Sequence, residues 1–173
     1  MRVVPELPRK DHGGRNLSTF LSTYSNKVDR KGRVSVPAAY RAALSGASFQ
    51  GVIAYPSLTD LAIESFGREM LERMNQERLS RSMEGGAFEE VLLGGGNDSV
   101  VETVMAMAHE LPFDGEGRII LPAALCEHAG IDDRAVFVGR GSRFQIWAPE
   151  PYAKRQADEV AKFRQRLNGG GAS

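Results

Sequence analysis

Cysteine is almost absent from this sequence, which has only Cys126 in 173 residues. One cysteine cannot form an intrachain disulfide, and a single thiol is typical of proteins kept in a reducing compartment. The sequence also lacks a run of about 18 apolar residues, the length that a membrane-spanning helix needs. Residues 1–16 lack the apolar core of a signal peptide. We therefore expect a cytoplasmic protein with no membrane partner.

An excess of charge of either sign is absent as well, because 22 basic residues balance 22 acidic ones. The total charge therefore does not indicate a polyanionic partner. The composition, 42% hydrophobic and 25% charged, is typical of a soluble globular protein. The length fits one ordinary domain or two small ones.

Side chains that could form a metal centre or a catalytic site are few. The possible soft metal ligands are His12, His109, His128 and Cys126. They lack the paired spacing of a zinc site. Ser35 has no neighbouring His or Lys to act as a base, and Gly94 to Gly96 are not followed by the Lys-Ser/Thr of a phosphate-binding loop. We expect no metal, no cofactor and no enzymatic activity.

One nine-residue pattern occurs twice. It reads DRKGRVSVP at residues 29–37 and DGEGRIILP at residues 114–122, so the two copies begin 85 residues apart. Both fit Asp-x-x-Gly-Arg-apolar-x-apolar-Pro. Because self-similarity at a fixed offset is the signature of an internal repeat, we interpret the chain as a duplication.

The elements around each motif follow the same order. A short strand leads to a turn (residues 30–32 in the first copy), a second strand (33–36) and a helix that starts at Pro37 and ends at Gly46. Proline at the first helical position costs no hydrogen bond, and glycine is the usual stop. In the second copy Pro122 and Gly130 have these roles. Two apolar runs then flank a polar turn, as in a β-hairpin, and a charged helix follows.

The boundaries of the segments follow from this order. We expect a flexible arm (1–19), the first repeat (22–66), a helix with a connecting segment (67–107), the second repeat (108–151), a C-terminal helix (152–168) and a tail (169–173). The apolar run at 100–108 fits either a helix or a strand. Since a unit of about 45 residues buries too little surface to be stable alone, the copies should complete one pseudo-symmetric β-rich core. Trp147 should lie in that core.

The repeated motif contains residues that a turn needs and one that it does not. The turn residues are Asp29, Gly32, Asp114 and Gly117. Glycine permits a positive φ, and aspartate can accept hydrogen bonds from nearby backbone N–H groups. The arginine after each glycine, Arg33 or Arg118, either bonds the aspartate across the turn or faces outward as a fork that suits phosphate and guanine.

The two copies differ in charge. Residues 24–44 hold five basic side chains and one acidic one, a net charge of +4, whereas residues 110–130 have a net charge of −3. Phosphate contacts supply affinity in proportion to the number of cations. The first copy is therefore better suited to a nucleic acid.

The duplicated motif, on this skeleton, resembles the MraZ family, whose two halves belong to the AbrB/SpoVT swapped-hairpin group. VLLGGG at 91–96, HAGI at 128–131 and FQIW at 144–147 match as well, and the resemblance covers about residues 20–165. It implies a β-rich α+β fold in which duplicated swapped-hairpin, AbrB-like halves form one pseudo-symmetric β-barrel with flanking helices.

The resemblance also implies a function. Members are bacterial sequence-specific DNA-binding transcriptional regulators, usually repressors, of the cell-division and cell-wall gene cluster. They assemble into homo-oligomeric rings that bind short direct repeats of double-stranded DNA in their own promoter, which implies a nucleoid-associated protein. An antitoxin-like or scaffold module on the same fold is the alternative, although an antitoxin would normally have one copy and a disordered tail.

Candidate DNA-binding residues follow from the motif and from the charge. The resemblance places the motif arginines at Arg33 and Arg118, and the neighbouring cations of the first copy are Lys31, Arg30 and Lys27. We hypothesise that the first copy faces DNA, while the second mainly completes the fold or the ring, with Arg118 paired to Asp114.

Overall fold

The computed structural model describes residues 17–84 and 99–169, which form eight strands and five helices. The elements are β1 (Thr23–Lys27), β2 (Arg33–Ser35), α1 (Ala38–Ala43), β3 (Gly51–Pro56), β4 (Ala62–Phe66), α2 (Arg68–Glu84), α4 (Ser99–Met107), β5 (His109–Pro112), β6 (Arg118–Ile120), α5 (Ala123–Ala129), β7 (Arg134–Gly139), β8 (Phe144–Trp147) and α6 (Pro149–Gly169). The predicted order of strand, strand, helix, strand, strand is confirmed in both copies.

The short helices begin and end near the predicted residues. Pro37 and Pro122 lie directly before α1 and α5, in extended conformations. Gly130 ends α5 with a φ of 65°, a left-handed conformation that glycine adopts without steric cost. The run at 100–108 is helical up to Met107 and forms most of α4 (Ser99–Met107). Gly94 to Gly96 and His12, which were considered from the sequence for phosphate and metal binding, lie outside the described residues.

The strands of the two copies alternate in the sheet. The main sheet has the order β1-β7-β8-β4-β3-β5, and β2 pairs with β6 in a separate ribbon. In the main sheet the counterparts in the two copies are β1 and β5, β3 and β7, and β4 and β8. If each strand is replaced by its counterpart, the same order is obtained in reverse. The first strand of each copy therefore pairs with the third strand of the other copy, so neither copy has a complete sheet of its own.

The α+β class is confirmed, but a closed barrel is not found in the described residues. The six-stranded antiparallel sheet has two edges, β1 and β5. The ribbon is joined to β1 by a single bridge, between Val28 and Val34.

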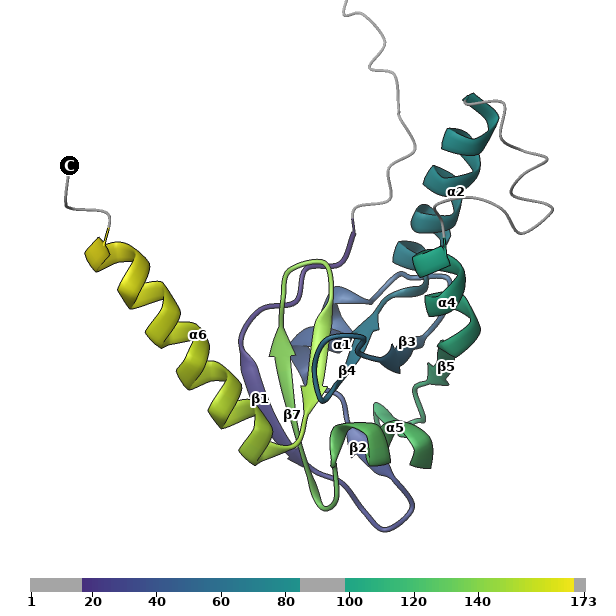
Figure 1. The fold of residues 1–173 in the computed structure, drawn as a ribbon. Helices are drawn as coiled ribbons and strands as arrows, with labels where there is room; N and C mark the ends of the chain where they lie inside the picture. The colour runs from purple at the N-terminus through teal and green to yellow at the C-terminus, as the bar shows by residue number, and fades with distance from the viewer. Residues whose placement is uncertain (1–16, 85–98, 170–173) are drawn as a thin grey trace, which may run out of the picture.

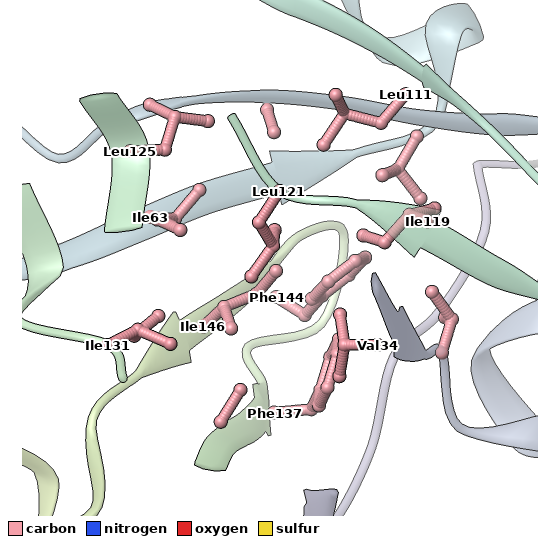
Figure 2. Packing of buried hydrophobic residues seen from close by; sticks show 14 of the residues in the cluster. Val34, Ile63, Leu111, Ile119, Leu121, Leu125, Ile131, Phe137, Phe144 and Ile146 are labelled. Carbon is pink, nitrogen blue, oxygen red and sulfur yellow. The ribbon is translucent and has the colours of Figure 1, made fainter. Parts of the chain in front are cut away.

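The main core lies between the sheet and the ribbon and takes side chains from both copies. Figure 2 shows Val34, Ile119, Phe137 and Phe144 directed into the same interior. Phe20, the residue directly after the predicted arm, is fully buried there and stacks edge-on against Phe144. The core thus depends on residues that are distant in the sequence.

A second, smaller cluster surrounds Trp147, which is buried as predicted. It contains Ala62, Val136 and Val138, and Tyr152 of α6 packs against it. This contact fixes the base of α6. The helix begins three residues before the predicted start because Ala148, preceding Pro149, accepts the first backbone hydrogen bond from Tyr152.

The long helices extend from the body of the protein (Figure 1). α2 contacts α4, where Arg78 donates to Glu102 at 2.5 Å. α6 buries none of its residues and exposes Val160, Phe163 and Leu167 along one side. None of the described helices has the length and apolar character needed to cross a membrane.

Candidate nucleic-acid interface

The first turn, residues 29–33, is organised by one aspartate. Asp29 Oδ1 accepts hydrogen bonds from the backbone N–H groups of Lys31 and Arg33, both at 2.9 Å. Its other oxygen, Oδ2, accepts from Arg33 Nε at 2.6 Å. The carboxylate therefore fixes the backbone of the turn and the direction of the arginine together.

The second turn, residues 114–118, has the same geometry. Asp114 Oδ1 accepts from the backbone N–H groups of Glu116 and Arg118 at 2.9 Å, and Oδ2 accepts from Arg118 Nε at 2.8 Å. These bonds stabilise the charged carboxylate. The backbone bond from Arg118, followed by its side-chain bond, lowers the pKa of Asp114 to about 2. Bonds to Arg33 lower the pKa of Asp29 in the same direction.

Each turn is also bonded to the other copy. The carbonyl of Gly32 accepts from Leu121 N at 2.9 Å, and the carbonyl of Gly117 accepts from Val36 N at 3.1 Å. Both glycines have positive φ, 78° and 74°. A Cβ at Gly32 would lie 2.7 Å from the backbone oxygen of Leu121. Glycine is therefore required at position 32, because the backbone has a positive φ and because a Cβ atom would clash with the Leu121 carbonyl.

The β2–β6 ribbon presents one buried side and one exposed side. Val34 and Ile119 face the core, whereas the alternate residues face outward. We call the outward residues the ribbon face: Arg33, Ser35, Arg118 and Ile120. In the pairing register Arg33 lies opposite Ile120, and Ser35 lies opposite Arg118. Each end of the ribbon face thus combines one motif arginine with one residue of the other copy.

The two ends of the ribbon face differ in charge. At the second turn, Arg118 Nη1 also pairs with Glu116 Oε2 at 3.1 Å. The first turn has Lys31 at the position of Glu116 and Arg30 at the position of Gly115, and both cations are exposed. Among the described residues, Asp29 is the one carboxylate that pairs with Arg33. The first turn has a net charge of +2, and the second of −1.

Comparison with known proteins identifies the family. The chain is 44% identical to the transcriptional regulator MraZ of Rickettsia akari over 150 residues, which cover 84% of this chain and 93% of the relative. It is 45% identical to that of Rickettsia canadensis over 156 residues, 87% of this chain and 96% of the relative. A family model described as "MraZ protein, putative antitoxin-like" matches residues 104–168.

The chain belongs to the MraZ family. It is accordingly a transcriptional regulator and not an enzyme.

In this MraZ-family chain the structure brings most of the predicted site residues together. Arg30, Lys31 and Arg33 lie at the first turn, and Arg118 lies at the other end of the same ribbon face. Lys27 is exposed at the end of β1, where it pairs in register with Arg134. It stands beside the first turn, because Val28 alone separates it from Asp29.

Two residues of this surface were not predicted from the sequence. Arg41 of α1 reaches the second turn: its Nε donates to Val36 O at 3.2 Å, and its guanidinium lies against Gly117. Ile120 is a large apolar side chain that is 60% exposed beside Arg33. Strand alternation would have placed Ile120 outward, whereas no local pattern relates Arg41 to a turn 76 positions away.

The described residues contain no group of three or more His, Cys, Asp or Glu side chains that could hold a metal ion. His109 is exposed at the start of β5, and His128 Nε2 lies 3.3 Å from the carbonyl oxygen of Asp60. Burial raises the pKa of the Cys126 thiol, which disfavours the reactive thiolate.

Proposed function

We propose that the ribbon face and the first turn bind double-stranded DNA, and that the protein is a sequence-specific regulator. Its targets would be short direct repeats in the promoter of the cell-division and cell-wall gene cluster that includes its own gene, where binding represses transcription. The curated relatives are named transcriptional regulators, and the family resemblance supplies the target. A regulator of this kind acts in the cytoplasm, on the nucleoid.

The fixed guanidinium of Arg33 is the observation that carries this proposal. Asp29 holds Arg33 through Nε, and the two terminal Nη nitrogens have no bond to another described residue. When Nε is bonded in this way, the two Nη nitrogens of the arginine point in one fixed direction. Two parallel donors of this kind suit O6 and N7 of guanine, or two oxygens of a phosphate. Because the geometry exists before binding, little side-chain entropy is lost on contact.

The shape and charge of the surroundings support the same partner. A two-stranded antiparallel ribbon fits the major groove of B-DNA. The exposed cations of the first turn, Arg30 and Lys31, flank Arg33, and Lys27 lies beside them. Contacts of lysine and arginine with phosphates supply affinity, whereas contacts with base edges supply sequence choice.

We propose that the two copies contribute unequally. Arg118 is bonded by Asp114 and Glu116, so its guanidinium is largely neutralised by its own turn. The second turn would repel phosphate unless Arg41 offsets its charge. The first copy then binds DNA, while the second completes the core and the ribbon.

Assembly into a ring would provide the affinity that one motif lacks. Linked copies that bind repeated sites gain affinity through a high effective concentration. The exposed apolar stripe of α6 (Val160, Phe163 and Leu167) is a surface that a neighbouring subunit would cover. The exchange of strands between the copies agrees with swapped hairpins, and closure of a barrel remains part of this proposal.

Fluorescence anisotropy with the DNA upstream of its own gene tests the proposal. We expect tight binding that weakens steeply as salt rises, and a larger loss of affinity for Arg33→Ala than for Arg118→Ala. The two variants are matched, because each loses the same bond to an aspartate. Thermal unfolding of both serves as the control for folding.

A conservative variant separates recognition from charge. Arg33→Lys keeps the charge and loses the fork, so it should retain binding to unrelated DNA while losing preference for the promoter. Equal losses of DNA affinity in Arg33→Ala and Arg118→Ala, with folding intact, would refute the proposal that the two copies contribute unequally to DNA binding. Absent or salt-insensitive binding would instead favour the antitoxin-like or scaffold module.

A further inference from the structure

Ile120 is an apolar side chain in a polar and cationic setting. It is 60% exposed, although it lies in a strand pair whose other side is buried in the core. Its counterpart in the first copy is Ser35, 85 residues earlier. A single exposed isoleucine needs no explanation by itself. The position of Ile120 does need an explanation, because this side chain lies directly opposite Arg33 and two residues from Arg118.

The register places Ile120 at the end of the ribbon that belongs to the first turn. Gly32 O accepts a hydrogen bond from Leu121 N, so the residue after Ile120 is attached to that turn. Ile120 and Arg33 are paired across the two strands, and side chains paired in this way have Cβ atoms about 5 Å apart. Successive bases of one DNA strand are about 3.4 Å apart. A groove that admits Arg33 would therefore place Ile120 over the same base pair or an adjacent one.

We propose that Ile120 is a specificity-determining residue that contacts the C5 methyl group of a thymine in the major groove, beside the base read by Arg33. This inference rests on the proposed function. The thymine methyl group is the apolar feature that the major groove offers, and apolar side chains recognise it. Arginine on guanine and isoleucine on thymine would together read two neighbouring base pairs.

A second copy of this chain fits the same surface poorly. A symmetric contact through the ribbon face would bring Arg33 and the exposed Arg30 and Lys31 close to the same cations of the partner. Like charges in an interface cost several kcal/mol. A polyanion that carries methyl groups at its base edges satisfies the cations and the isoleucine together.

The experiment removes the methyl group from the DNA and from the protein independently. The upstream fragment is amplified with either thymidine or deoxyuridine triphosphate, since uracil pairs as thymine does but lacks the methyl group. We expect the wild type to bind the uracil fragment at least about fourfold more weakly, the effect of losing one buried methyl contact. Ile120→Ala should bind both fragments equally, whereas Ile120→Val should retain a preference for thymine.

Comparing the thymine preference of the wild type with that of Ile120→Ala cancels any change that uracil causes in DNA shape, because both proteins bind the same two fragments. An equal preference for thymine in the wild type and in Ile120→Ala, with tight binding to the promoter, would overturn this inference and leave the proposed function intact. A smaller assembly of Ile120→Ala in native mass measurements would also overturn it, because Ile120 would then be a subunit contact. Failure of the wild type to bind either fragment would overturn both proposals.

Discussion

Val34 and Ile119 lie opposite each other in the β2–β6 ribbon, and each is the other's counterpart in the 85-residue repeat. Ile63 and Ile146 also pair with each other, across β4 and β8, and hold corresponding places in the two copies, although 83 residues separate them. All four side chains are buried. The pseudo-two-fold axis therefore passes through the hydrophobic core, and the ribbon face is attached to the centre of the protein.

Ile119→Ala should strongly destabilise the protein. Removing a fully buried isoleucine side chain leaves a cavity and costs about 2–5 kcal/mol, whereas Ile119→Val should cost about 0.5–1.5 kcal/mol. Urea denaturation measures the free energy of unfolding. Ile120→Ala is the matched control, since the Ile120 side chain is exposed and the change should stay within about 0.5 kcal/mol. Similar losses at both positions would contradict the observed register.

Alanine at the turn glycines should also be costly. Gly32 and Gly117 have positive φ, and a non-glycine residue held in such a conformation costs about 1–3 kcal/mol. We expect Gly32→Ala to cost more, because its Cβ would meet the backbone oxygen of Leu121. At Gly117 the Cβ would meet the Arg41 side chain, which can move.

Gly115→Ala provides the control for these variants. Gly115 is in the second turn, but its φ is not positive and a Cβ there would meet nothing within 4 Å. Thermal unfolding of the three variants gives the comparison. A loss for Gly115→Ala as large as that for Gly32→Ala would show that the positive φ is not the cause.

Acid should weaken both turns. The folded pKa of Asp114 is about 2, below its ordinary value of 3.8, and that of Asp29 is lowered as well. A carboxylate with a lowered folded pKa contributes stability that is complete above about pH 4 and is lost as the pH falls toward 2. Asp114→Asn should therefore be less stable than the wild type at pH 6.

The difference between the wild type and Asp114→Asn should shrink between pH 4 and pH 2, because the wild-type carboxyl becomes protonated over that interval. Denaturant titrations at a series of pH values measure it. A difference that stays constant down to pH 2 would mean that the charge of Asp114 does not stabilise the turn.

Exchanging the charges of the turns should exchange their contributions to DNA binding. Lys31→Glu introduces the acid found in the second turn, and Glu116→Lys removes the partner of Arg118 Nη1. The slope of log K against log salt changes by about 0.9 for each phosphate that the protein neutralises. We expect Lys31→Glu to weaken binding with a shallower slope, and Glu116→Lys to strengthen it with a steeper one.

Anisotropy titrations at several salt concentrations give both slopes, and the double variant should return near the wild-type value. An unchanged slope for Glu116→Lys would show that position, and not charge, keeps the second turn away from DNA. Lys162, an exposed lysine of α6, supplies a control at a distance from the ribbon. Lys162→Glu should leave the slope unchanged.

The sequence by itself determined the local structure of both motifs. Aspartate accepts bonds from backbone N–H groups two and four residues ahead, glycine supplies the positive φ, and proline precedes the helix. These are short-range requirements, and the two copies satisfy them with nearly the same hydrogen-bond lengths. The duplicated order of elements was predictable for the same reason.

Only the tertiary structure decided which parts of the copies meet. The position of Ile120 beside Arg33 and that of Arg41 beside Gly117 depend on pairing between strands of different copies. Glu64 is buried, and Gln145, 81 positions away in the sequence, compensates its burial by donating a hydrogen bond to it at 2.7 Å. Short-range patterns specify which side of a strand a residue faces. They do not specify its neighbours across strands, since these depend on how the two incomplete halves bury one shared core.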